Sequence, residues 1–125
     1  MKDQNLWSAG EYFLNCYSSA NNKIINTYYY VSEDKINDLI VAPVAGQMVL
    51  NPILACQDKQ LRILTDKGDK VLYNCQFDAS CITISMGPDL SERQGPIIGY
   101  GLGNGGIGVL ELMRNSSQTL WSMDP

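Results

Sequence analysis

Short extended runs separated by turn-forming residues recur along this chain and restrict it to a fold made mainly of strands. "EYFLNCYS" and "INTYYYVS" flank "SSANNK", "LRIL" and "VLYNCQF" flank "TDKGDK", and "CITISM" follows. Runs rich in β-branched and aromatic residues, bounded by Gly, Asn, Asp and Ser, are typical of antiparallel hairpins. The 125 residues have the length of one domain, so we expect a single domain over residues 1–125.

Two hairpins are predicted from these signals. The first extends from about Tyr12 to Val31. The second turns at Asp66-Lys67-Gly68, where Gly68 supplies the positive φ of a three-residue loop. This second pairing places a set of apolar side chains on one face of the sheet: Leu61, Ile63, Val71 and Tyr73.

One segment, "SEDKINDLIVAP", predicts a short helix near residues 33–41. Its apolar residues Ile36, Leu39 and Ile40 have the i, i+3, i+4 spacing of one helical face. Ser32 is a suitable N-cap, and Pro43 is a suitable stop.

Other short runs complete the expected fold class. Asn51-Pro52 interrupts "GQMVLNPILACQ", which favours an edge strand or a bend, since proline cannot donate to a sheet ladder. The tail is expected to return as a strand through Leu120 and Trp121. The chain is therefore predicted to be mainly β, a small antiparallel sandwich or barrel of about 7–8 strands with one short helix.

The four cysteines are an even number in a chain without histidine, which favours disulfides over a zinc site. The predicted pairs are Cys75 with Cys81, within "CQFDASC", and Cys16 with Cys56. Buried free thiols are the main alternative. Two disulfides would require an oxidising compartment, so the protein is expected to be periplasmic or secreted, with its signal peptide removed. No metal or other cofactor is expected.

The stretch "PIIGYGLGNGGIGVLELM" contains the spacing of a nucleotide-binding loop at Gly101, Gly103 and Gly106. The residues that follow do not suit a helix, so we interpret the stretch as a hairpin that turns at Asn104-Gly105. A two-residue turn would leave one face of this hairpin without side chains, formed by five glycines: Gly99, Gly101, Gly103, Gly106 and Gly108. Such a face could lie under a large ring such as Trp7, or it could receive a ligand or a partner's loop.

Charge and composition exclude several classes of function. The net charge of −4, with its scattered cations, does not suit nucleic-acid binding, and no apolar run is long enough to span a membrane. The lack of histidine removes Ser-His-Asp and Cys-His catalysis, so no enzyme is predicted. Glu111 is expected at the solvent-exposed end of an otherwise apolar strand, and a buried, paired charge is the alternative.

These observations predict an extracytoplasmic inhibitor or immunity protein that blocks a basic secreted or periplasmic enzyme, such as a peptidoglycan hydrolase. The alternatives are a carbohydrate-binding module and, less well supported, a carboxylate-based glycosidase. In the main hypothesis "GLGNGG" or "GPDLSERQGP" enters the partner's cleft through protein–protein contacts. The predicted binding residues come from these two loops: Tyr100, Gly101, Gly103, Asn104, Gly105, Ser91, Glu92 and Arg93.

Overall fold

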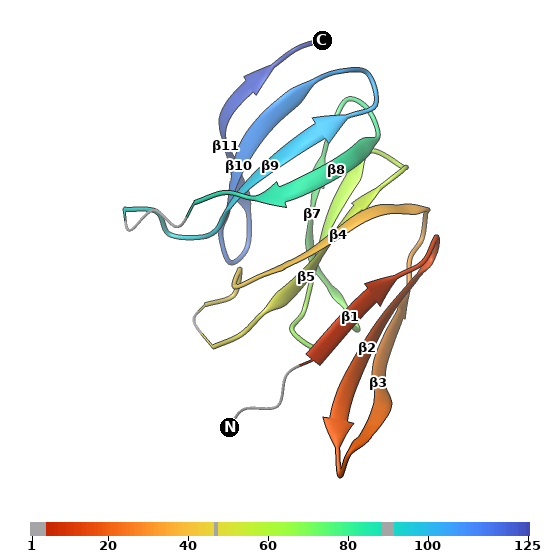
Figure 1. The fold of residues 1–125 in the computed structure, drawn as a ribbon. Coiled ribbons are helices and arrows are strands. Elements are labelled where there is room, and N and C mark those ends of the chain that lie inside the picture. Colours follow the sequence, from red (N-terminus) through yellow and green to blue (C-terminus); the bar gives the residue numbers. More distant parts are fainter. Residues whose placement is uncertain (1–4, 47, 89–91) are drawn as a thin grey trace.

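The computed structural model describes residues 5–46, 48–88 and 92–125, which form eleven strands in three antiparallel sheets (Figure 1). The strands are β1 (Asn5–Ala9), β2 (Phe13–Ala20), β3 (Lys23–Val31), β4 (Ile36–Ala42), β5 (Asn51–Cys56), β6 (Gln60–Leu64), β7 (Val71–Gln76), β8 (Cys81–Met86), β9 (Ile97–Leu102), β10 (Ile107–Leu112) and β11 (Ser117–Met123). Neighbours in a sheet are consecutive in the chain, so the first sheet is β1–β3, the second β4–β7 and the third β8–β11. The prediction of a mainly antiparallel β fold is confirmed. No helix occurs in the described part, and so none there could span a membrane.

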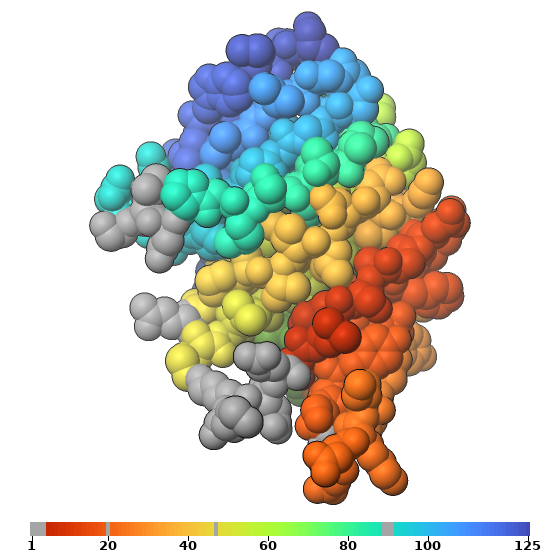
Figure 2. All heavy atoms as spheres, viewed as in Figure 1, coloured from red at the N-terminus to blue at the C-terminus, as the bar shows by residue number. Residues whose placement is uncertain are grey.

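The three sheets stack face to face in chain order, as the successive colour bands of Figure 2 show. The second sheet lies in the middle and buries both of its faces. Leu54, Cys56 and Leu64 pack with Leu14 of the first sheet, whereas the opposite face packs against the third sheet. That second core includes Ile53, Ala55, Leu61, Ile63, Ile98, Leu110 and Leu112. The predicted sandwich or barrel of 7–8 strands is therefore wrong, because three sheets enclose two separate cores.

The first hairpin was predicted correctly. β2 and β3 pair from Phe13 with Val31 to Ala20 with Lys23. Asn21 and Asn22 form the turn with φ of 52° and 62°, in the left-handed region that asparagine tolerates. In Figure 1 this hairpin extends beyond the second sheet.

The predicted helix near residues 33–41 is wrong, because residues 36–41 belong to β4 and residues 33–35 form the connection that precedes it. Ile36 and Ala42 are buried, and the strand lies beside both β5 and β8. Helix propensity differs by less than about 0.7 kcal/mol per ordinary residue, while burying one Ile or Leu side chain contributes about 2 kcal/mol. Pairing and burial therefore outweigh the helical spacing. Ser32 does not cap a helix; its N–H donates to Tyr12 O at 2.8 Å.

The expectation of an edge strand at Asn51-Pro52 is also wrong. β5 is a central strand whose six residues are all buried. Proline is accommodated because β5 pairs with β6 only from Ile53 to Ala55, after Pro52. Before Ile53, the Asn51 side chain connects β5 to β6, because its Nδ2 donates a hydrogen bond to Leu64 O at 3.1 Å.

The β6–β7 hairpin turns where predicted, with Gly68 at φ +71°. A Cβ at Gly68 would lie 2.6 Å from the Trp7 ring, so Trp7 packs on this glycine and not on the glycines of the 96–113 stretch, where a large ring was predicted. Leu61, Ile63 and Tyr73 share a face, as predicted. Val71 does not, because a bulge reverses its direction and places it against the core beside the first sheet.

The glycine stretch forms the β9–β10 hairpin, but its predicted register is wrong by one residue. Leu102 N–H donates to Gly106 O at 2.8 Å, so three residues separate the paired ends instead of two. Ile107 therefore lies opposite Gly101, and Gly108 opposite Tyr100. A shift of one residue moves a side chain to the other face of a strand. The five glycines are divided between both faces, and no bare face forms.

The predicted disulfides are absent: all four cysteines are buried free thiols. Cys75 and Cys81 do not belong to one hairpin, since β7 and β8 lie in different sheets. The Cys75 thiol donates to Ser117 Oγ at 3.1 Å. Burial raises the pKa of Cys75, and burial together with nearby Asp38 raises the pKa of Cys81 to about 12. These thiols are therefore protonated and unreactive near neutral pH.

We expect Ellman titration of the protein, unfolded without reductant, to return all four thiols. In the native protein the reaction is expected to be much slower and to accelerate as the pH rises, because only thiolates react. Two or fewer free thiols in the unfolded protein would contradict this account.

Candidate protein-binding groove

At one end of the second sheet and of the third sheet, a turn forms a hydrogen bond with the connection that precedes the first strand of that sheet. Gln57, in the β5–β6 turn, donates its N–H to Lys35 O at 2.8 Å, just before β4 begins. Gly103, in the β9–β10 turn, donates its N–H to Ser80 O at 2.8 Å, just before β8 begins. The second and third sheets therefore present equivalent loops at this end.

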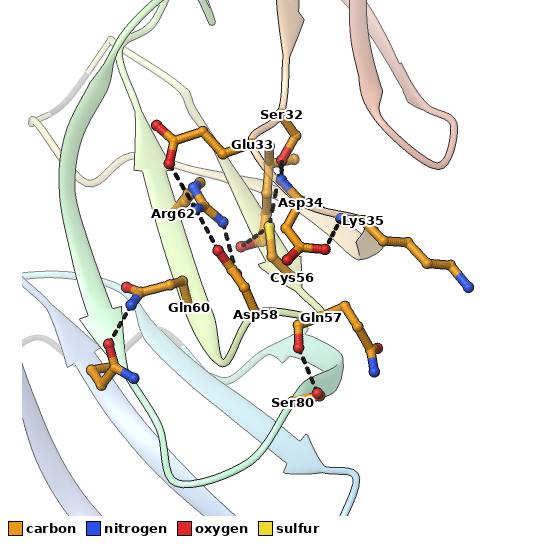
Figure 3. A network of polar contacts seen from close by, with 12 residues as sticks. Ser32, Glu33, Asp34, Lys35, Cys56, Gln57, Asp58, Gln60, Arg62 and Ser80 are labelled. Carbon is orange, nitrogen blue, oxygen red and sulfur yellow. Dashed lines mark hydrogen bonds and ion pairs between the residues drawn. The ribbon is translucent and has the colours of Figure 1, made fainter.

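In the second sheet, these loops surround a buried arginine (Figure 3). Arg62 is 3% exposed and shares a face with Leu54, which packs toward the first sheet. Its guanidinium donates to both carboxylate oxygens of Asp58, at 2.6 and 3.0 Å. A further contact of 3.5 Å reaches Glu33, in the connection before β4. The arginine is thus held between two acidic loop residues.

The electrostatics of this cluster follow from its hydrogen bonds. The Arg62 guanidinium lowers the pKa of Asp58 through their hydrogen bond, and that bond raises the pKa of Arg62. Burial raises the pKa of the nearby Cys56 thiol, although Arg62 opposes the shift. Arginine retains its charge when buried, and its planar donors fit a carboxylate. The cluster therefore joins the loops of the second sheet by a permanent ion pair.

The third sheet has a glycine where the second has Arg62. Arg62 is the third residue after Lys59, which has φ +69°, and Gly108 is the third residue after Gly105, which has φ +94°. Arg62 pairs with Leu54, and Gly108 pairs with Tyr100. A Cβ at Gly108 would collide with the Tyr100 ring. The phenol therefore lies over the position from which an arginine side chain would extend.

A groove of about 400 Å³ lies between the second and third sheets. It is lined by β7, the β7–β8 connection, the β9–β10 turn and β11. We call it the aromatic groove because the rings of Phe77 and Tyr100 line it, with centroids 4.5 Å apart and an interplanar angle of 30°. Asp78 and Asp124 also line it. Burial raises the pKa of Tyr100, with smaller contributions from Cys81, Asp124 and Asp78. No lysine or arginine occurs among its described lining residues.

One of the two predicted binding loops belongs to this groove. Tyr100 and Asn104 line it. Asn104 Oδ1 accepts the N–H of Gly106 at 2.9 Å, which fixes the turn. Gly105 supplies the positive φ there, and Gly103 is exposed beside it. Gly101 lies within β9, where a Cβ would be 3.0 Å from Thr83 Cγ2.

The other predicted loop lies at the opposite end of β9 and cannot join the same site. Ser91 lies outside the described residues, and Glu92 is exposed. Arg93 contacts Glu111 at 3.7 Å, and the N–H of Gln94 donates to Glu111 at 2.7 Å. Glu111 is 3% exposed, so its expected position at a solvent-exposed strand end is wrong. Its carboxylate instead anchors this loop.

Sequence reasoning missed Arg62, Phe77, Asp78 and Asp124. A signal for Arg62 was present, since a cation inside the apolar run "LRIL" requires a buried acidic partner. Within the described ranges, no cluster of three or more His, Cys, Asp or Glu residues could hold a metal ion.

Three consecutive meandering sheets, whose first strands lie side by side (β1 by β4, and β4 by β8), are characteristic of β-propeller blades. Solved propellers share this fold. The crystal structure of Sqt1 from Saccharomyces cerevisiae matches with a TM-score of 0.73 at 15% identity, over 90% of this chain and 33% of that chain. A structure of BBS1N in complex with ARL6DN matches with a TM-score of 0.69 at 15% identity, over 97% of this chain and 37% of that chain.

The sequence comparisons identify the family within this class. The BBS7 beta-propeller family matches residues 1–125. The BBSome complex member BBS7 of Mus musculus is 30% identical over 95 residues, which are 76% of this chain and 13% of the mouse protein. The chain therefore belongs to the BBS7 beta-propeller family, and it spans a small part of the length of this relative.

Membership in this family overturns the predicted function. The interpretation as an inhibitor or immunity protein is wrong, and with it the carbohydrate-binding and glycosidase alternatives. The periplasmic or secreted location is also wrong, since its premise was disulfide bonding and the cysteines are free. The mouse relative is named as a complex member, so the broader expectation of a protein partner is taken up below as a proposal. A basic secreted enzyme as that partner has no support.

Replacing Arg62 with methionine is expected to lower the free energy of unfolding by about 2 kcal/mol. Loss of a buried ion-pair partner typically costs about 3–5 kcal/mol, but Asp58 and Glu33 are 25% and 80% exposed and can be solvated. Urea unfolding measures the change. The exposed cation variant Lys67→Met is the matched control and should change stability by less than about 0.5 kcal/mol.

The same variant should change the acid sensitivity of the protein. Because the pKa of Asp58 is lowered in the folded state, its stabilisation is present above the ordinary carboxyl pKa of about 4 and is lost as pH falls through the lowered value. Arg62→Met should therefore weaken the loss of stability below about pH 4. An unchanged pH profile from urea midpoints would contradict the assigned ion pair.

Proposed function

We propose that the protein is a non-enzymatic subunit of a multiprotein complex and that it binds a partner protein at the aromatic groove. Residues 1–125 would act as one unit in this role. The observation that carries the proposal is the groove itself, in which two aromatic rings and two carboxylates lie beside a turn held in place by its own side-chain hydrogen bond.

The composition of the groove supports a protein ligand. Tyrosine and phenylalanine are enriched at protein interfaces because they provide large contact areas at a small cost in side-chain entropy. Tyr100 is half-buried, so its ring is fixed in place and still accessible from the groove. The relatives support a partner of the same kind, since the mouse relative is named as a member of the BBSome complex.

The proposed contact residues are those of the β9–β10 hairpin. Tyr100 and Asn104 would contact the partner directly, and the exposed turn residues Gly103 and Gly105 would let the partner's chain approach the backbone. Gly101 lies within β9 against Thr83 and is outside this proposal. Glu92 and Arg93, at the other end of the sheet, are outside this proposal.

A photo-crosslinking amino acid at Thr119, an exposed residue that lines the groove, is expected to capture a subunit of the assembled complex. The same crosslinker at Tyr29, which is 67% exposed on the first sheet, is the control and should not capture that subunit. Mass spectrometry identifies the crosslinked peptides. Tyr100→Ala should reduce the yield at Thr119 at least about fivefold, a loss typical of an interface aromatic.

Formation of the complex without any crosslink from the groove would count against the proposal. If position 119 gave no crosslink to any other subunit while the complex still formed, the groove would not be the binding site. An equal yield for the wild-type protein and Tyr100→Ala would exclude a role for the phenol.

A further inference from the structure

We propose that the aromatic groove binds an arginine side chain presented by the partner, in the way that Asp58 and Glu33 hold the buried Arg62 between the first and second sheets. This inference rests on the proposed function and specifies the chemistry of the partner. It arises from comparing two equivalent places in the same molecule, one with an internal cation and one without.

The Arg62 cluster, between the first two sheets, shows how this architecture accommodates an arginine. Arg62 is the third residue after the turn, and its side chain is almost completely buried against the first sheet. Glu33 contacts it from the connection that precedes β4, and Asp58 contacts it from the turn. Both loops therefore direct an acidic group toward the same guanidinium.

The aromatic groove retains one of the two acidic positions of this arrangement and lacks the cation. Asn104 takes the position of Asp58, and Asp124, just after β11, provides a second carboxylate. Asp78 lies two residues before Ser80, as Glu33 lies two residues before Lys35, and these two carbonyls accept equivalent hydrogen bonds. Gly108 takes the position of Arg62. Neither Asp78 nor Asp124 forms an ion pair with any residue in the described ranges. The carboxylates thus face a groove with no positive charge of its own.

The walls of the groove suit guanidinium better than ammonium. A planar guanidinium stacks on aromatic faces and can bond a carboxylate with two donors, whereas ammonium is a compact and strongly hydrated charge. Phe77 and Tyr100 supply the faces, and Asp78 and Asp124 supply the acceptors. Each cation–π contact at a partly exposed site contributes roughly 0.5–1 kcal/mol. The volume of about 400 Å³ is ample for one arginine side chain with its flanking backbone.

The direct test titrates the ¹⁵N-labelled protein with acetyl-Gly-Arg-Gly-amide and records the amide signals of Gly105, Gly106 and Gly108. We expect these signals to shift at millimolar peptide, and we expect the citrulline peptide, which has the same shape but no charge, to leave them unchanged. A lysine peptide should bind more weakly than the arginine peptide. Equal shifts from the citrulline and arginine peptides, or none from either, would overturn the proposal.

Two carboxamide variants localise the effect. Asp78→Asn combined with Asp124→Asn should weaken arginine-peptide binding roughly fivefold to tenfold, since two partly exposed ion pairs are lost. Asp66→Asn combined with Glu92→Gln changes the net charge equally at exposed positions that do not line the groove, and it should have no effect. Equal effects of the two double variants would show attraction by overall charge alone.

A third variant supplies the arginine from within the chain. Gly108→Arg with Tyr100→Leu reproduces the Arg62 and Leu54 pair of the second sheet and removes the collision with the phenol. Its side chain should occupy the groove, abolish the peptide-induced shifts and preserve the folded amide spectrum. A folded double variant that still binds the arginine peptide as the wild type does would contradict the proposal.

The failure of this inference can be distinguished from the failure of the proposed function. In one outcome, position 119 crosslinks to a segment without a nearby arginine, and the Asp78 and Asp124 variants have no effect. The groove would then remain a protein-binding site, but arginine binding would be excluded. Arginine-specific shifts without any crosslink would confirm the pocket's chemistry and contradict its role in the complex.

Discussion

Burial of both faces of the middle sheet is the constraint on which the rest of the structure depends. β5 contributes Leu54 and Cys56 to one core and Ile53 and Ala55 to the other, all without exposed surface. Each fully buried aliphatic side chain contributes about 2 kcal/mol, so the sheet is stable only with a neighbour on each side. This requirement stacks the three sheets as blades and places their turns at a common end, where the aromatic groove forms.

The equivalent places in the second and third sheets differ in their residues, with Arg62 beside Leu54 in one and Gly108 beside Tyr100 in the other. At Arg62 the chain fills the space itself and joins two loops through Asp58 and Glu33. At Gly108 the Tyr100 ring covers the backbone, and the groove stays open beside it. The first arrangement stabilises the unit, while the second leaves an acidic and aromatic surface at the same end. Under the proposed function, equivalent positions of successive blades therefore serve stability in one case and recognition in the other.

Local signals predicted local structure well and the assembly poorly. The Asn21-Asn22 and Gly68 turns were recognisable because their backbone conformations demand particular residues. The helical spacing of Ile36, Leu39 and Ile40 misled because a strand between β5 and β8 has apolar neighbours on several sides. Tyr100 and Asn104 were predicted from the glycine hairpin. Their acidic neighbours come from the β7–β8 connection and from the residue just after β11, and only the packing of the sheets brings these together.

The most direct test of the account is a high-resolution cryo-electron microscopy map of the assembled complex that contains this protein. The account predicts polypeptide density from another subunit in the aromatic groove, with a guanidinium stacked on Tyr100 and within hydrogen-bond distance of Asp78 or Asp124. A map in which the groove faces solvent, or in which further residues of the same protein fill it, would contradict the account.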